Sequence, residues 1–241
     1  MLGTLFNFLF IKIIYRPFFN VLILIYQLLP WGPDMGLALI IFTIFINICL
    51  LPLSMREDQN APEKEELLHE LKLIEQQYRG YPLLIKKERQ RLIRQHRRII
   101  WSRLFSYAIY VLYFIILYRV FKTGIKGRDL KLLYSFVPQP KQPLNTNFLG
   151  VLELTQPSPL LNTISAIFTI PAELLSIMFS PLPPTREDWL GVFLAPIVAF
   201  VITYRIPSGQ ELFFTISLIF IIIVLLTRQF LRVFLPSLTG K

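Results

Sequence analysis

The chain has 241 residues, of which 54% are hydrophobic, and its formal net charge is +10. Soluble domains are typically about 45–50% apolar even when glycine is counted, so this composition excludes an ordinary soluble domain and predicts an all-α, polytopic membrane protein. The basic excess favours contact with anionic lipid head groups, and ribosomal RNA is a second candidate partner. We expect no DNA partner.

Cysteine and histidine are scarce. Cys49 is the single cysteine of the sequence, and its two histidines, His69 and His96, lie in a charged stretch where solvated side chains are the rule. An internal disulfide framework is therefore excluded, and no constellation of metal ligands is visible. We expect no metal and no cofactor.

Residues 1–34 contain two apolar blocks, which are separated by Lys12 and Arg16-Pro17. The second block, 18–29, is short for a helix that crosses a bilayer core of about 30 Å, which takes roughly 20 apolar residues. We find no cleavage site of a signal peptide. The pattern predicts an interfacial helix or tilted anchor with Trp31 at head-group depth, or alternatively a spanning segment over residues 3–29.

Residues 35–54 form the first predicted core span. The stretch "GLALIIFTIFINICLLPLSMR", from Gly36 to Arg56, is almost unbroken in its apolar character, with Asn47 near its middle. Thr43 lies one helical turn before Asn47 and therefore on the same face. An amide in such a helix either joins it to a neighbouring helix or lines a hydrated groove, and the two roles can coexist.

Residues 55–102 are of a different kind, because they carry most of the charge. Leucines recur at helical spacing after Asn60, and Gly80-Tyr81-Pro82 interrupts the pattern. The first arm is acidic and the second is basic, which favours an antiparallel helical hairpin over a solvated loop. The basic residues of the second arm are candidates for contact with the ribosome or with lipid: Lys86, Lys87, Arg89, Arg91, Arg94, Arg97 and Arg98.

Four further spans are predicted after the hairpin. The second covers 103–121 and the third covers 159–179, with a polar connection at 122–158 and a short loop at 180–188. The fourth and fifth lie within 189–231 and are joined by a tight turn that contains Pro207 and Gly209. Residues 232–241 form a tail.

The distribution of basic residues predicts the orientation of these spans. If the hairpin is cytoplasmic, then more of the 25 Lys and Arg residues lie on the cytoplasmic side than on the other side, as the positive-inside rule requires. The loop 180–188 and the C-terminal tail then share the cytoplasmic side, and the connection 122–158 lies outside. A basic cluster in that connection, from Arg119 to Lys131, argues against this orientation.

Several stretches together resemble the YidC/Oxa-type membrane protein insertases. "RPFFNVLILIYQLLP" followed by "MGLALIIFTIFINICLLPLSM" is similar to the proline-led helix and first core span of that family. "NFLGVLELTQPSPLLNTISAIFTI" resembles the approach to its third core span, and "APIVAFVITYRIPSGQELFF" resembles the connection between its fourth and fifth spans. The resemblance covers about residues 16–231 and rests on the order and spacing of these motifs.

One position departs from the family pattern. Family members usually carry a positive residue, mostly arginine, four residues after the threonine of the first core span, and here that position is Asn47. The stretch "SMREDQN" after Leu53 also differs from the basic and glutamine residues usual there. The resemblance therefore supports the fold more strongly than the charge-dependent mechanism.

The resemblance implies a protein that integrates nascent membrane proteins and helps them fold, through a hydrophilic groove in the membrane. This task requires no covalent chemistry, so the resemblance also implies that the protein is not an enzyme. Such a groove lowers the desolvation barrier, because a central charged residue costs about 2.5–3.5 kcal/mol on the insertion scale. The residues that we expect to line it are Asn47, Thr43, Ser106, Tyr110, Tyr113, Thr163, Thr169 and Glu173, with Gln210, Glu211 and Thr215 near its outer end. Expected partners are nascent membrane proteins, the ribosome, a Sec-type translocon and anionic lipids.

Other interpretations remain open at this point. The chain could be a membrane scaffold that binds ribosomes or a translocon without inserting substrates, or a chaperone of helix packing beside a Sec-type translocon. A small-solute transporter is disfavoured because no inverted repeat is apparent. Since the chain is compact and shows no transit peptide, we expect it in a bacterial plasma membrane.

Overall fold

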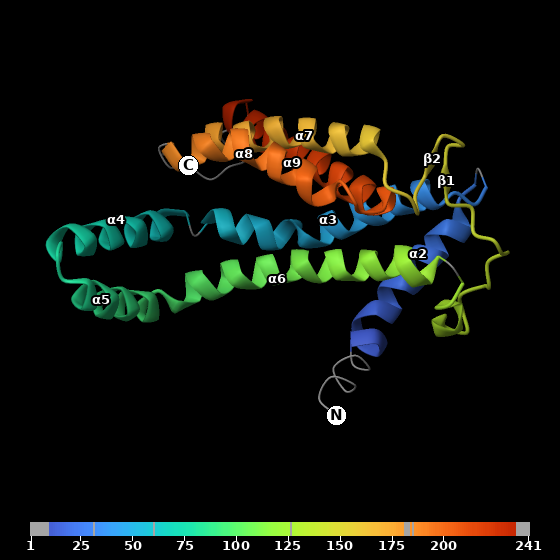
Figure 1. Ribbon diagram of the computed structural model, residues 1–241, viewed down its shortest axis with the longest axis horizontal. Coiled ribbons are helices and arrows are strands. Elements are labelled where there is room, and N and C mark those ends of the chain that lie inside the picture. The colour runs from blue at the N-terminus through green and yellow to red at the C-terminus, as the bar shows by residue number, and fades with distance from the viewer. Residues whose placement is uncertain are drawn as a thin grey trace. The chain divides into compact units, whose positions relative to one another are not determined.

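A computed structural model describes residues 10–30, 32–59, 61–125, 127–180, 184 and 186–234 (Figure 1). Within helices, the side chains of 53–59, 61, 62, 64, 65, 68, 98–107, 110, 187, 232 and 233 are not described. The described α-helices are α2 (Arg16–Leu28), α3 (Met35–Gln59), α4 (Ala61–Gln77), α5 (Pro82–Gln95), α6 (Arg97–Arg119), α7 (Pro159–Met178), α8 (Arg186–Thr203) and α9 (Ser208–Phe234). Shorter elements are π-helical turns at Phe10–Tyr15 and Val120–Gly124, a 3-10 turn at Leu130–Leu132, and strands β1 (Asn147–Phe148) and β2 (Leu152–Glu153).

Four of the described helical segments are long and apolar enough to cross a membrane. They are Phe10–Leu28, Met35–Pro52, Pro159–Met178 and Ser208–Leu231, and a shorter apolar helix covers Asp188–Thr203. The prediction of an all-α polytopic membrane protein is thereby confirmed. The N-terminal segment, for which the sequence left two alternatives, has the length of a span. The predicted second span, 103–121, covers most of α6 and the first two residues of the π-helical turn that follows it.

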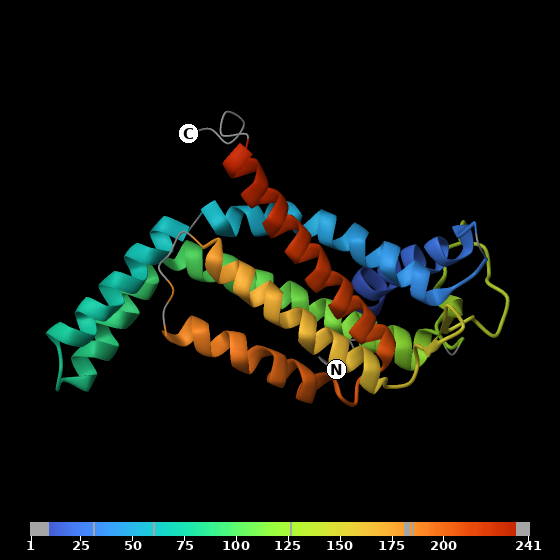
Figure 2. The same ribbon diagram turned by 90° about the horizontal axis from the view of Figure 1, so that it is seen from above.

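Contacts divide the chain into two units. The larger unit contains Met1–Asn47, Phe114–Ser180 and Pro184–Lys241, and the smaller contains Ile48–Tyr113 with Pro181–Pro183. In the larger unit, α7 packs against both α8 and α9, as the two views show (Figure 1, Figure 2). The Ser158 hydroxyl caps α7 by accepting a hydrogen bond from the Leu161 N–H at 3.4 Å.

The N-terminal helix of the larger unit is fixed by the connection that follows α6. Arg16 donates from Nε to the Leu132 carbonyl at 2.8 Å, and the amide oxygen of Asn20 accepts from the Tyr134 N–H. These groups lie more than 100 residues apart in sequence. These hydrogen bonds pair backbone groups that a loop would otherwise leave unpaired. They therefore attach α2 to the connection.

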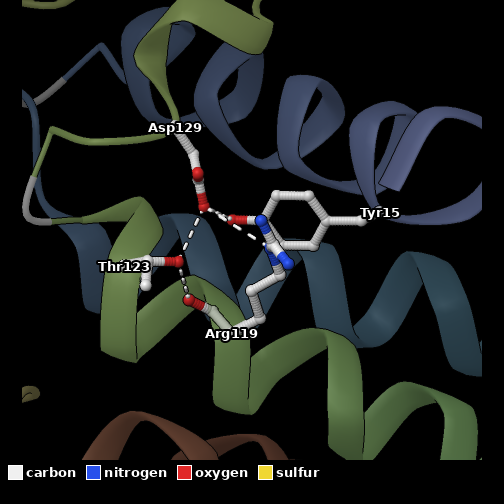
Figure 3. Close-up of polar contacts among 4 residues, drawn as sticks. All are labelled: Tyr15, Arg119, Thr123 and Asp129. Atoms are coloured by element: carbon white, nitrogen blue, oxygen red, sulfur yellow. Dashed lines mark hydrogen bonds and ion pairs between the residues drawn. The ribbon is translucent and has the colours of Figure 1, made fainter. Parts of the chain in front are cut away.

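A compact polar cluster adds to this attachment (Figure 3). Asp129 accepts hydrogen bonds from the Tyr15 hydroxyl at 2.8 Å and from the Thr123 hydroxyl at 2.7 Å. The Arg119 guanidinium lies 4.7 Å from the centre of the Tyr15 ring, and its Nε is 3.7 Å from the Asp129 carboxylate. Tyr15 and Asp129 are both buried, so the carboxylate satisfies hydroxyl groups that have little access to water.

Two glycines of the larger unit allow close packing of aromatic rings. A Cβ on Gly36, at the start of α3, would lie 2.1 Å from the ring of Phe148, and a Cβ on Gly209 would lie 1.9 Å from the ring of Phe121. Neither distance is compatible with a side chain. These contacts place β1 against the start of α3, and the start of α9 against the π-helical turn Val120–Gly124 that follows α6.

The smaller unit contains the charged hairpin formed by α4 and α5. The helices are joined by a turn that includes Gly80, whose φ is +97°, in the left-handed region that glycine favours. Leu67 and Leu92 are the buried apolar side chains that the structure describes on the two arms, and His96 Nε2 lies 3.7 Å from the Glu70 carboxylate. The two arms therefore pack against each other, with a polar contact between His96 and Glu70.

Candidate functional site

Polar side chains of α9 face two neighbouring helices within an otherwise apolar segment. On one face, the Asn47 amide of α3 donates to the Ser217 hydroxyl of α9 at 3.0 Å. The same amide donates to the Thr43 carbonyl of its own helix at 2.9 Å. Asn47 is only 8% exposed, and its amide nitrogen bonds both the backbone of α3 and the Ser217 hydroxyl of α9.

Thr43 lies directly under this amide and is fully buried. Its hydroxyl donates to the Leu39 carbonyl one turn earlier, at 2.6 Å. Threonine commonly satisfies its hydroxyl in this way within apolar helices. Thr43 and Asn47 therefore form a pair of polar side chains on the buried side of α3. Their donors bond the Leu39 and Thr43 carbonyls and the Ser217 hydroxyl.

The opposite face of α9 is polar where it meets α7. The hydroxyls of Ser165 and Thr215 hydrogen-bond to each other across the two helices. Thr169, one turn further along α7, donates to the Ser165 carbonyl at 3.0 Å, and all three side chains are buried. Interhelical hydrogen bonds of this kind hold membrane helices in a fixed register.

A third polar contact joins α7 to α8. The Thr203 hydroxyl donates to the Asn162 amide oxygen at 2.7 Å, and the Asn162 amide nitrogen donates to the Phe200 carbonyl at 3.2 Å. Asn162 is 1% exposed. Together with the contacts of Asn47 and Ser165, this gives a series of hydrogen-bonding groups along the interior of the larger unit.

Glu211 lies in the first turn of α9 and is 1% exposed. Neither of its carboxylate oxygens has a hydrogen-bond partner among the described residues, although Thr203 lies close enough to interact with the carboxylate. A buried carboxylate without partners is expensive to place in an apolar environment. Carboxylates in membrane segments are candidates for function by default, so Glu211 joins the polar groups of this region.

The structure places the remaining predicted groove residues differently from one another. Thr163 is exposed on α7 and donates to the Pro159 carbonyl at 2.8 Å, whereas Glu173 is half-buried on the same helix. Tyr113 is 8% exposed and belongs to the smaller unit. The side chains of Ser106 and Tyr110 lie outside the described residues. The predicted groove residues that are buried in the larger unit are therefore Asn47, Thr43 and Thr169, together with Gln210, Glu211 and Thr215 of the expected outer end.

The predicted turn between the fourth and fifth spans lies at the start of α9. The Gly209 N–H donates to the Leu154 carbonyl at 3.0 Å, and the Pro207 carbonyl accepts from the Gln210 N–H at 2.9 Å. Gly209 also leaves the space that the Phe121 ring occupies. Close packing, besides the turn itself, accounts for glycine at this position.

The basic residues of the second hairpin arm are exposed wherever their side chains are described. They are Lys86, Lys87, Arg89, Arg91, Arg94 and Arg97, and the side chain of Arg98 lies outside the described residues. Arg91 lies 3.8 Å from the Glu88 carboxylate, and its side chain is 72% exposed. An exposed pair of this kind contributes little to stability.

Ser217, Ser165, Asn162 and Thr203 take part in the site but are absent from the sequence-based candidates. Serine and threonine in membrane helices usually bond their own backbone, so their presence in a span carries little information. Helical spacing gave one indication that Ser217 belongs to the site, because Ser217 lies seven residues after Gln210 and therefore on the same face of α9. The helix pairing that brings Ser217 to Asn47 is not visible in such a pattern.

The arrangement is suited to hydrogen bonding. Among the described residues, no group of three His, Cys, Asp or Glu side chains could hold a metal ion. What the site offers is a set of amide, hydroxyl and carboxyl groups inside helices that are otherwise apolar. Such groups can replace water around a polar chain in the membrane.

The family relationship is decided by a match over most of the chain. The model of the family described as "60Kd inner membrane protein" matches residues 25–231. This chain belongs to that YidC/Oxa-type family. The resemblance found in the sequence motifs is thereby confirmed.

Two relatives within the YidC/Oxa-type family are named membrane protein insertase YidC. One, from Fusobacterium nucleatum subsp. nucleatum, is 28% identical over 190 residues, which cover 78% of this chain and 83% of the relative. The other, from Enterococcus faecalis, is 26% identical over 193 residues, which cover 79% of this chain and 65% of the relative. The YidC/Oxa-type chain described here therefore spans slightly less than two thirds of the second relative's length.

Proposed function

We propose that this chain is a membrane protein insertase, which integrates nascent membrane proteins and helps them fold in a bacterial plasma membrane. The observation that carries the proposal is the family match over residues 25–231. The buried hydrogen-bonding groups around α9 supply a physical reason for it. A polar segment that crosses a bilayer loses its water, and each unsatisfied backbone group then costs several kcal/mol.

The proposed groove works through exchange of hydrogen bonds. Asn47 donates to Ser217 and to the Thr43 carbonyl in the resting chain, and an amide can equally donate to and accept from a passing polypeptide. Because Asn47 carries no charge, its attraction for acidic residues in the substrate is weaker than that of an arginine. We therefore propose that insertion by this chain depends little on the acidity of the translocated tail.

Reconstitution in lipid vesicles tests both parts of the proposal. Purified protein is incorporated without a translocon, a short single-span substrate is synthesised in its presence, and insertion is measured by protection of the tail from protease. We expect insertion by the wild type, a loss in Asn47→Leu, and retained insertion in the control Ile44→Leu, whose side chain is 40% exposed on the same helix. Failure of the wild type to insert, with ribosomes still bound, would identify a scaffold instead.

The charge argument has its own comparison. Acidic residues in the substrate tail are replaced by their amides, and insertion is measured with the wild type and with Asn47→Arg. We expect little change with the wild type and a clear loss with Asn47→Arg, which restores the positive charge usual in the family. A sharp loss with the wild type would contradict the uncharged-groove mechanism, while leaving the insertase activity itself established.

We also propose that the hairpin is cytoplasmic and that the basic face of α5 binds an anionic partner there. The ribosome is the partner that the proposed function favours, because its RNA carries dense negative charge. Co-sedimentation with ribosomes is compared for the wild type and for Lys86→Glu with Arg89→Glu. We expect the double variant to lose binding, while equal loss from vesicles of anionic lipid would assign the face to the membrane instead.

A further inference from the structure

The short hairpin of β1 and β2 carries two large apolar side chains at its tip. Leu149 is 64% exposed and Val151 is 88% exposed. Leu149 also has a φ of +51° and is followed by Gly150 at +73°. A turn with two consecutive positive φ values favours Asn-Gly or Gly-Gly, so leucine here is unfavourable both in its backbone conformation and in its exposure to water.

Hydrogen bonds hold this tip firmly at the start of α3. The Asp34 carboxylate accepts from the Gly36 N–H at 2.7 Å and from the Leu37 N–H at 3.0 Å through Oδ1, which caps the helix. Its other oxygen, Oδ2, accepts from the Leu149 N–H at 3.0 Å. The Phe148 ring fills the space beside Gly36, so the strained turn is set in place by α3 itself.

The same segment also meets the starts of α9 and α7. The Leu154 carbonyl accepts from the Gly209 N–H at 3.0 Å, and the Gln156 carbonyl accepts from the Ser208 N–H at 2.9 Å. Three residues later, Pro159 begins α7. Figure 1 shows the hairpin beside the beginning of α3. Since α3, α7 and α9 all begin here and all have the length of a span, a bilayer crossed by these helices would have one of its boundaries near the tip.

The base of the hairpin is charged, in contrast to its tip. Burial of the Glu153 carboxyl would raise its pKa, but hydrogen bonds from the Thr155 and Thr146 side chains and from the Thr155 N–H outweigh this and hold the pKa below its ordinary value. The Thr155 hydroxyl donates to Glu153 at 2.7 Å. The ionised Glu153 carboxylate resists entry into hydrocarbon. The hairpin is therefore suited to a shallow position in the bilayer.

We propose that Leu149 and Val151 enter the lipid at this boundary and form a shallow membrane contact of the larger unit. Burial in lipid offsets the exposure of two apolar side chains and gives a reason for leucine where the backbone favours asparagine or glycine. The tip is too small for a stable protein partner, whose interface takes about 800 Å² on each side. Leu160, at the start of α7, is likewise apolar and 70% exposed.

Spin labels on the full-length protein test this contact independently of insertion activity. Cys49 is first replaced by serine, and single cysteines are then introduced as Leu149→Cys, Val151→Cys and, as a control in the exposed part of the same connection, Gln139→Cys. In lipid vesicles, we expect labels at 149 and 151 to be more accessible to oxygen than to a water-soluble nickel complex, and the label at 139 to show the reverse. High nickel accessibility at 149 and 151 would overturn the proposal.

A second variant separates lipid contact from an effect on folding. Leu149→Asn suits the backbone of the turn and should leave the fold intact while removing one of the two apolar groups. We expect a label at Val151→Cys to become more accessible to nickel in this background. An unchanged label, or a label protected from both oxygen and nickel, would contradict the proposal, and the second result would indicate that protein covers the tip.

Discussion

Replacement of Asp129 tests how the N-terminal helix is attached to the larger unit. Asp129→Ala removes the acceptor of the Tyr15 hydroxyl, which is fully buried, and an orphaned buried donor costs about 1–3 kcal/mol. Thr123 keeps a second acceptor in the Arg119 carbonyl at 3.0 Å, so its contribution is smaller, about 0.5–1.5 kcal/mol. The part-exposed Arg119 pair at 3.7 Å adds less than about 1 kcal/mol. We expect a loss of about 2–4 kcal/mol in the free energy of unfolding.

The assay is equilibrium unfolding of the purified protein in mixed micelles, with an anionic detergent as denaturant. Tyr15→Phe should cost about 1–2 kcal/mol, and the double variant with Asp129→Ala should lose about 1–2 kcal/mol less than the sum of the two, because both remove the same hydrogen bond. The exposed neighbour Lys131→Ala should stay within about 0.5 kcal/mol of the wild type. A loss below about 1 kcal/mol for Asp129→Ala, with additive behaviour, would refute the reasoning.

Three further predictions concern α9. Gly209→Ala places a Cβ 1.9 Å from the Phe121 ring and should lower the free energy of unfolding by about 1–3 kcal/mol or more; near-wild-type unfolding would show that the ring moves freely. Ser217→Ala removes the acceptor of the Asn47 amide and should cost about 0.6–1.7 kcal/mol in the same assay, with no effect if that bond does not form. Glu211→Gln keeps the shape but removes a carboxylate that lacks partners among the described residues, so stability should be equal or higher; a clear loss would reveal a partner for the charge.

The helical architecture follows largely from the sequence because spans are defined by local properties. Length and apolar composition suffice to predict the helices that contain Thr43 and Thr169, and turn residues such as Gly80 mark where helices end. The N-terminal helix was harder to assign, because Lys12 and Arg16 interrupt its apolar blocks. In the structure, Arg16 reaches the Leu132 carbonyl, a contact that makes the charge acceptable but cannot be read from its neighbours in sequence.

The candidate site was predictable only in part. Asn47 stands out in the sequence because an amide is unusual in an apolar run, and Thr43 follows from helical geometry. Ser217 is 170 residues away from Asn47, and nothing in its own span distinguishes it from a serine bonded to its backbone. Residues whose role depends on which helices pack together therefore require the tertiary structure, whereas residues that are unusual in their own segment do not.

The double use of Asp34 has a consequence for the order in which the chain can assemble. One oxygen of its carboxylate accepts from a backbone N–H of α3 itself, whereas the other accepts from the Leu149 N–H, 115 residues later in the chain. Contacts of such long sequence separation form late, since the intervening chain must first be made and folded. During synthesis α3 can enter the membrane early, yet its capped end is completed only after the segment before α7 has crossed to the same side. Variants that slow this late step should accumulate chains with correctly inserted helices and an accessible, protease-sensitive connection.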